Sequence, residues 1–147
     1  WAIARTVLVY GLANDLSRSN IILWVKSSLE AGKQIQVVDD QERTPTLAED
    51  LAAGCILIAE QGATGVFNIS GAELLTPYDM AMQTADFFGL NKELIVRTDS
   101  TRFTQPARRP MRTGFVIQKA MDQLGYRPKT FRMGIELLAK QITLASA

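Results

Sequence analysis

The sequence contains no histidine, the side chain that most often acts as a general base or a zinc ligand. Without it, no Ser-His-Asp or Cys-His arrangement for nucleophilic catalysis can form. The single cysteine, Cys55, excludes a disulfide within the chain. Because Cys55 lies in the apolar run 51–59, we expect a buried structural thiol rather than a reactive one. These absences argue against hydrolases and zinc enzymes.

Long apolar runs are also missing. No stretch reaches the roughly 18 to 20 apolar residues that a membrane-spanning helix needs, and no signal-peptide pattern opens the chain. We therefore expect a soluble, cytoplasmic protein with no membrane partner. A length of 147 residues, of which 47% are hydrophobic, is enough for one domain with a substantial core.

Charge is distributed unevenly along the chain. The net charge is +1, but residues 1–96 contain 6 basic and 12 acidic side chains (−6), whereas residues 97–132 contain 9 basic and 2 acidic ones (+7). The basic segment could face an anionic ligand, or it could face the acidic part of the same fold. It has few interleaved aromatic residues and no recognised nucleic-acid-binding motif, so we expect no nucleic-acid partner.

Apolar periodicity predicts strands that alternate with helices. The predicted strands cover residues 1–11, 34–38, 65–71 and 94–96, and the predicted helices cover about 21–29, 47–61, 77–88, 115–124 and a stretch capped by Thr130. This alternation indicates an α/β domain with some parallel pairing. We expect residues 98–112, which are polar, basic and contain proline, to form an extended loop.

Several of these predictions are specific to single residues. The first strand is apolar and should be buried. Thr76, Pro77 and Asp79 should start a helix as its N-cap, first residue and capping acid. Helical spacing places four large side chains in the core: Trp24, Met80, Phe87 and Phe88.

The junction between the strand at 34–38 and the next helix concentrates charged and turn-forming residues. Thr46 stands where an N-cap belongs, and Glu49, three residues later, completes the pattern of a capping box. Arg43 then lies in the loop, where its planar guanidinium can bind a phosphate or carboxylate through two parallel hydrogen bonds. The alternative is a surface ion pair with an acid of the same loop, Asp39, Asp40 or Glu42.

Four segments carry a resemblance to a known family. They are Arg5-Thr6-Val7-Leu8-Val9-Tyr10-Gly11, Val38 to Thr46 followed by Asp50-Leu51-Ala52, Gly65 to Gly71, and Ala107-Arg108-Arg109-Pro110. In this order they resemble the C-terminal half of the extended short-chain dehydrogenase/reductases, most closely the dTDP-4-dehydrorhamnose reductase branch. The four segments together span nearly the whole chain.

The resemblance implies a two-part enzyme, in which an N-terminal Rossmann half binds NAD or NADP and a C-terminal half closes over a nucleotide-sugar. Residues 1–147 would form a single C-terminal substrate-binding domain, with the N-terminal half absent and with strands that complete a Rossmann-type parallel sheet. The family's glycine-rich fingerprint and Tyr-x-x-x-Lys pair are missing, since Tyr126 has its lysine three residues later at Lys129. We therefore expect no catalytic residue here, and exposed strand edges that could promote a homodimer.

By the same resemblance, Arg43 and Arg109 match positions that reach toward the nucleotide diphosphate. Thr6 and Val7 match the strand end beside the nicotinamide. Leu8 stands where many relatives place asparagine or tryptophan against the substrate, which suggests that the substrate differs from dTDP-4-dehydrorhamnose.

Asp40 and Gln41 can hydrogen-bond the sugar or base, or they can stabilise the turn that contains them. The leading hypothesis is the substrate-binding portion of an NAD(P)-dependent nucleotide-sugar reductase, with an epimerase or dehydratase as a close variant. A second hypothesis is a non-catalytic regulatory subunit, as similarity to methionine adenosyltransferase regulatory subunits permits. Leu8 fits that hypothesis too.

Overall fold

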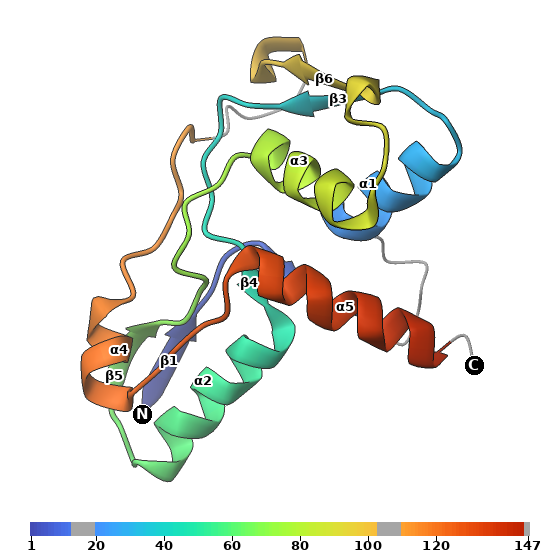
Figure 1. The fold of residues 1–147 in the computed structure, drawn as a ribbon. Coiled ribbons are helices and arrows are strands. Elements are labelled where there is room, and N and C mark those ends of the chain that lie inside the picture. The colour runs from blue at the N-terminus through green and yellow to red at the C-terminus, as the bar shows by residue number, and fades with distance from the viewer. Residues whose placement is uncertain (13–19, 103–109, 146–147) are drawn as a thin grey trace.

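The structure, a computed structural model, describes residues 1–12, 20–102 and 110–145. Its elements form two groups joined by extended segments (Figure 1). One group contains β1 (Ala2–Arg5), β5 (Gly65–Asn68), α2 (Ala48–Glu60) and α4 (Gln118–Leu124). The other contains β3 (Ile35–Val38), β6 (Ile95–Thr98), α1 (Ile21–Glu30) and α3 (Pro77–Phe88). The last helix, α5 (Phe131–Ala145), lies between the two groups.

The strands pair in parallel, as the alternation of strands and helices predicts. β1 pairs with β5, β3 pairs with β6, and the short β2 (Val9–Tyr10) pairs with β4 (Thr46–Leu47). Their registers align Ala2 with Gly65, Ile35 with Ile95 and Val9 with Thr46. Two 3₁₀ turns, Lys92–Leu94 and Ser100–Arg102, flank β6. The expected α/β class is confirmed.

The core consists of three clusters of buried apolar side chains. One lies between α1, α3, β3 and β6, and another lies among α2, β5 and α4. The third links the groups, because it combines residues of β2, β4, α1, α3 and α5: Tyr10, Ile22, Leu47, Met80, Phe131, Ile135 and Leu138. Tyr10 and Phe131 meet edge to face, with ring centroids 5.2 Å apart. Helix α5 therefore fastens the two groups together.

The predicted start of the helix at 77 is confirmed. Thr76 accepts a hydrogen bond from the Asp79 amide at 3.0 Å, and the Asp79 carboxylate accepts one from the Thr76 amide at 2.9 Å. Pro77 occupies the first turn, and Gly89 ends the helix in the left-handed conformation with φ 65°. This reciprocal cap fixes where the segment after β5 becomes α3.

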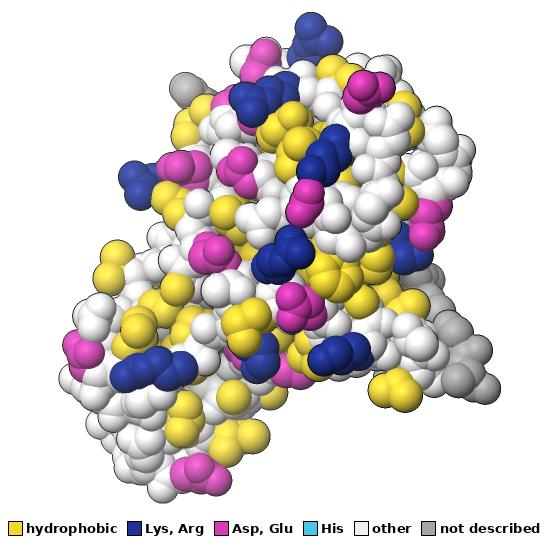
Figure 2. Space-filling model, viewed as in Figure 1, with side chains coloured by type: hydrophobic (Ala, Val, Ile, Leu, Met, Phe, Trp, Pro, Cys, Tyr) yellow, Lys and Arg dark blue, Asp and Glu magenta, His cyan; other side chains and the backbone are white. Residues whose placement is uncertain are grey.

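The prediction of one buried strand over residues 1–11 is wrong. The chain forms two short strands, and Leu8 between them has φ 45°, which interrupts the extended backbone. All four residues of β1 are exposed. Pairing with β5 covers one edge of β1 but neither of its faces, and its apolar side chains remain open to solvent; Figure 2 shows hydrophobic side chains over this group.

The capping box predicted at Thr46 and Glu49 is also wrong. Thr46 belongs to β4, and its hydroxyl donates to the Val7 carbonyl at 2.7 Å. Leu47 precedes α2 without any side-chain cap. Glu49 instead accepts a hydrogen bond from the Gln141 amide on α5 at 2.6 Å. Glu49 therefore bonds a residue far away in the sequence, whereas the local pattern predicts that it caps the start of α2.

Two side chains expected in the core are exposed. Cys55 is exposed because α2 buries the face that carries Gly54 and Ile58, and Cys55 is one residue off that face. Trp24 is 39% exposed, because α1 packs through Ile22, Val25 and Leu29. Of the remaining predicted core residues, Met80 is fully buried, and Phe87 and Phe88 are partly buried against the core.

The basic segment faces the acidic part of the same fold at four places. Each of four cations from residues 97–132 pairs with an acid from residues 1–96: Arg97 with Asp39, Arg112 with Glu42, Lys129 with Asp50, and Arg132 with Asp86. Three of these pairs are well exposed, and such pairs contribute little stability. The Lys129–Asp50 pair differs, because the Asp50 side chain is 5% exposed.

Candidate functional site

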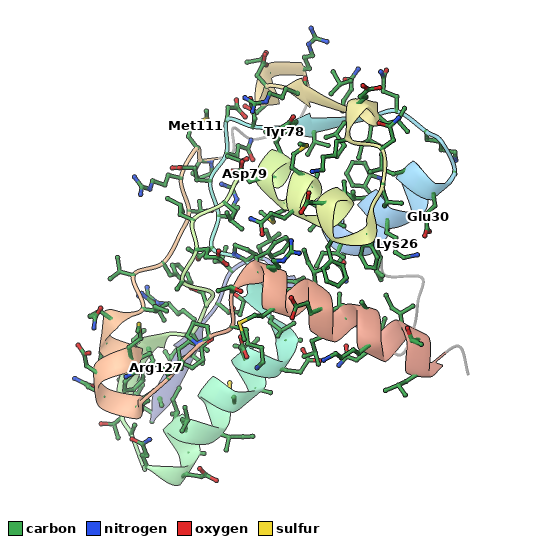
Figure 3. The ribbon with its side chains drawn as sticks, in the orientation of Figure 1. Lys26, Glu30, Tyr78, Asp79, Met111 and Arg127 are labelled. Carbon is green, nitrogen blue, oxygen red and sulfur yellow. The ribbon has the colours of Figure 1, made fainter. Side chains whose placement is uncertain are left out.

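Three extended segments cross between the two groups of elements: residues 39–46, 70–76 and 110–117 (Figure 1). The first segment lies hydrogen-bonded to both others. Glu42 donates its amide to the Met111 carbonyl at 2.7 Å, and its carbonyl accepts from the Thr113 amide at 3.1 Å. On the other side, Arg43 and Leu75 exchange amide-to-carbonyl bonds of 2.9 and 2.8 Å. Figure 3 labels Met111 on the outer segment of this crossing.

Two glycines lie where the segments of the crossing come close together. A Cβ at Gly71 would lie 2.1 Å from the Pro45 carbonyl oxygen, and a Cβ at Gly114 would lie 2.5 Å from Leu74 Cδ1. Both distances are shorter than a van der Waals contact. Glycine at position 71 therefore lets its segment approach the backbone of the central one, whereas at Gly114 the close neighbour is the end of the flexible Leu74 side chain.

Buried hydroxyls connect the three segments. Thr44 donates to the Ser70 hydroxyl at 3.2 Å and accepts from the Phe115 amide at 3.1 Å. The Ser70 hydroxyl donates in turn to the Gly71 carbonyl at 3.0 Å, and the Ser70 carbonyl accepts from the Tyr126 hydroxyl at 3.2 Å. Burial raises the pKa of Tyr126 above its ordinary value, and the carboxylate of Asp50 and the thiol of Cys55 make smaller contributions. The sequence reasoning missed this network.

The Arg43 guanidinium is oriented by its own loop. Its Nη1 donates to the Glu42 carbonyl at 2.8 Å, and its Nη2 donates to the Gln41 side-chain oxygen at 2.8 Å. Gln41 is 8% exposed, whereas the Arg43 side chain belongs to a residue of intermediate exposure. A guanidinium can bind a carboxylate or a phosphate through two parallel hydrogen bonds.

The acids of this loop have their own contacts. Asp39 lies 3.7 Å from Arg97, and Glu42 lies 3.5 Å from Arg112. Asp40 accepts from the amide and hydroxyl of Ser100 at 3.0 and 2.7 Å. Asp40 thereby fastens the loop to the 3₁₀ turn after β6, while its Oδ1 is buried without a hydrogen-bond partner in the part of the chain that the structure describes.

The residues expected beside a nicotinamide lie next to Thr46. The Thr6 hydroxyl donates to the Thr46 hydroxyl at 3.2 Å, and the Leu8 carbonyl accepts from the Thr46 amide at 3.0 Å. With the Thr46–Val7 contact described above, the Thr6 hydroxyl and the carbonyls of Val7 and Leu8 are hydrogen-bonded within the chain. Leu8, which follows Thr6 and Val7, is 42% exposed.

Two further residues complete the account of the predicted site. Arg109 lies outside the described residues. Asp50, which the sequence reasoning did not single out, accepts from the amide and ammonium of Lys129 at 2.6 and 2.7 Å. Helical spacing could have found it, because Asp50, Gly54 and Ile58 lie four residues apart on the buried face of α2.

Neither a metal-binding cluster nor a membrane-spanning helix is found in the described ranges 1–12, 20–102 and 110–145. No group of three or more His, Cys, Asp and Glu side chains is placed to hold a metal ion. No helix is long and apolar enough to cross a membrane.

The parallel pairing of strands that alternate with helices makes the chain an α/β protein, in which three extended segments meet around Arg43. The family model described as "RmlD substrate binding domain" matches residues 1–144, and the chain belongs to this family.

Two curated relatives illustrate the range of the similarity. The chain is 28% identical over 124 residues to the "Probable low-salt glycan biosynthesis reductase Agl14" of Haloferax volcanii, covering 84% of this chain and 41% of that protein. It is 31% identical over 142 residues to "Methionine adenosyltransferase 2 subunit beta" of Pongo abelii, covering 92% of this chain and 42% of that protein. The chain thus spans less than half the length of these relatives.

Solved structures show the same fold. A dTDP-4-dehydrorhamnose reductase from Clostridium acetobutylicum superposes with a TM-score of 0.85 at 20% identity, over 97% of this chain and 49% of that one. The dTDP-4-dehydrorhamnose reductase of Bacillus anthracis, solved in complex with NADP, gives 0.81 at 19% identity, over 95% and 48%. The expected fold, the parallel α/β fold found in part of such a reductase, is confirmed.

Proposed function

We propose that this chain is the nucleotide-sugar-binding portion of an NAD(P)-dependent reductase of the dTDP-4-dehydrorhamnose reductase type. The observation that carries the proposal is Arg43, whose guanidinium is oriented by two hydrogen bonds at the crossing of the three segments. In this function Arg43 binds the diphosphate, and Arg109 contributes a second guanidinium. Asp40 lies on the same loop, where it can reach the sugar or base, and Leu8 lies against the substrate.

The chemistry would be divided between two parts of a longer protein. An N-terminal Rossmann half would bind NAD or NADP and supply the Tyr-x-x-x-Lys pair, and this chain would orient the sugar for hydride transfer. The exposed strand β1 supports such a division, since within the described residues its second edge has no partner strand and can pair with further strands. Thr6 and Val7 would then border the nicotinamide at the end of that strand. A cytoplasmic location and a homodimer remain predictions.

A regulatory function is the second candidate. The relative at 31% identity is named a subunit of methionine adenosyltransferase, and Leu8 offers no hydrogen bond to a substrate. A chain of this kind would keep the fold and use it to bind a partner enzyme. An epimerase or dehydratase is a variant of the first candidate, because a dTDP-glucose 4,6-dehydratase from Bacillus anthracis shares the fold with a TM-score of 0.75.

Calorimetry with the full-length protein tests the diphosphate assignment. Thymidine diphosphate and uridine diphosphate serve as probes. Arg43→Ala should weaken the binding of at least one probe by roughly 1 to 3 kcal/mol, the scale of a charge-assisted hydrogen bond. Lys33→Ala is the matched control, because it removes the same charge from the exposed turn after α1. Equal affinities for the wild type and Arg43→Ala would rule out the assignment.

Oxidation of NADPH or NADH separates the two candidate functions. The full-length protein should oxidise one of them in the presence of a 4-keto nucleotide-sugar if it is a reductase. Probe binding without any turnover, together with stable association with a methionine adenosyltransferase, would favour the regulatory function instead.

A further inference from the structure

Gln41 differs from the charged residues of its loop in burial and in its partner. It is 8% exposed, and its side-chain oxygen accepts the hydrogen bond from Arg43 Nη2 at 2.8 Å. Since a guanidinium can only donate, the oxygen rather than the nitrogen of the amide must face Arg43. The direction of this contact is therefore fixed by chemistry.

The second contact of Arg43 comes from the backbone. Nη1 donates to the carbonyl of Glu42, and the position of that carbonyl is set because Glu42 accepts from Thr113 and donates to Met111. The backbone of Arg43 itself is paired with Leu75 on the other side. Of the two acceptors described here, one is part of the hydrogen-bonded crossing, and Gln41 supplies one from a buried side chain.

We infer that Gln41 is a positioning residue, which orients the Arg43 guanidinium for an anionic ligand and does not contact that ligand. The inference rests on the proposed function. A flexible arginine loses rotamer freedom when it binds, and a guanidinium that is already oriented loses less. A neutral amide gives this orientation without adding a negative charge next to the ligand, whereas a carboxylate at the same place would oppose an anion.

The test measures thymidine diphosphate and uridine diphosphate binding by the full-length protein in a double-mutant cycle. Gln41→Leu removes the acceptor of the Arg43 hydrogen bond and places an apolar side chain of similar size in the same buried position. In the wild-type background it should weaken probe binding roughly fivefold to tenfold, because the Arg43 side chain would then lose its rotamer freedom only when the probe binds. In the Arg43→Ala background the same substitution should change affinity less than about twofold, because the group that it orients is gone.

Gln41→Glu gives an independent test. It keeps an acceptor for Arg43 but adds a charge, so it should weaken binding more than Gln41→Leu does, and the excess should shrink as salt is raised. Gln36→Leu is the matched control, since Gln36 lies exposed on β3. Thermal unfolding of each variant checks that the protein remains folded.

The possible results separate the inference from the proposed function. A similar loss from Gln41→Leu in both backgrounds would show direct contact with the ligand and overturn the inference, while leaving the role of Arg43 intact. An unchanged affinity in Gln41→Leu, with a weakened Arg43→Ala, would also overturn it. If neither probe binds the wild type, or if Arg43→Ala binds normally, the proposed function fails and the inference fails with it.

Discussion

The Thr44 hydroxyl donates to the Ser70 hydroxyl at 3.2 Å, although 26 residues separate them in the sequence. Thr44 is 3% exposed and Ser70 is fully buried. The same Thr44 oxygen accepts from the Phe115 amide, so one side chain contacts both outer segments of the crossing. A chain of hydrogen bonds runs from Phe115 through Thr44 and Ser70 to the Gly71 carbonyl. Such chains are stronger together than apart.

Thr44→Val should therefore destabilise the protein by about 1 to 3 kcal/mol, the cost of leaving a buried donor unsatisfied. Valine has the shape of threonine, so the loss isolates the hydroxyl. Thr44→Ser keeps the hydroxyl and should recover most of the stability. Urea unfolding of the three proteins measures both effects, and equal stabilities for Thr44→Val and the wild type would contradict the role given to this network.

Leu8 has φ 45°, a left-handed conformation that costs an ordinary side chain roughly 1 to 2 kcal/mol. Asparagine tolerates this conformation better. Because Leu8 is 42% exposed, its replacement loses little burial. We expect Leu8→Asn to raise the free energy of unfolding by roughly 0.5 to 1 kcal/mol.

The matched control for that prediction is Val9→Asn. Val9 is similarly exposed, at 46%, but lies in the extended strand β2, where asparagine is unfavourable. Val9→Asn should lower stability, measured by the same thermal or urea unfolding. A loss of stability in both variants would show that the conformation of Leu8 carries no strain.

Local patterns predicted the elements well and their partners poorly. The prediction of the helix cap at Thr76 is correct because its two partners, Thr76 and Asp79, lie three residues apart. The same pattern failed at Thr46 because Val7, 39 residues away, takes its hydroxyl. Periodicity does not predict the contacts of Thr44, Ser70 and Asp50 for the same reason. Their hydrogen-bond partners come from other segments of the chain, and a local pattern does not show which segments lie side by side. The site is built from such long-range contacts.

The exposure of Cys55 is directly testable. The thiol lies on the outer side of α2, one residue from the buried Gly54. We expect a thiol reagent to label the folded chain almost as fast as the chain in denaturant, since access rather than unfolding should limit the reaction. Mass spectrometry over time compares the two rates. Labelling that waits for unfolding would place Cys55 in the interior after all.

Tyr126 and Tyr10 should make the protein sensitive to alkali. Burial raises the pKa of both hydroxyls above 10.0, and neighbouring Asp50 raises both further. In the unfolded chain tyrosine ionises near pH 10, so above that pH the unfolded state binds fewer protons than the folded state. Stability is therefore fully present below about pH 10 and should fall as pH rises beyond it.

Tyr126→Phe isolates the contribution of one hydroxyl. It loses the bond to the Ser70 carbonyl, so stability near neutral pH should decrease by about 1 kcal/mol. The free energy of unfolding of Tyr126→Phe should fall less steeply between about pH 9 and pH 11 than that of the wild type, because the variant lacks the Tyr126 hydroxyl proton. Urea unfolding across this range, with phenolate absorbance followed in parallel, measures both quantities. If all tyrosines of the wild type ionise before unfolding begins, the Tyr126 hydroxyl is accessible to solvent in the folded protein, which would contradict its burial beside Ser70.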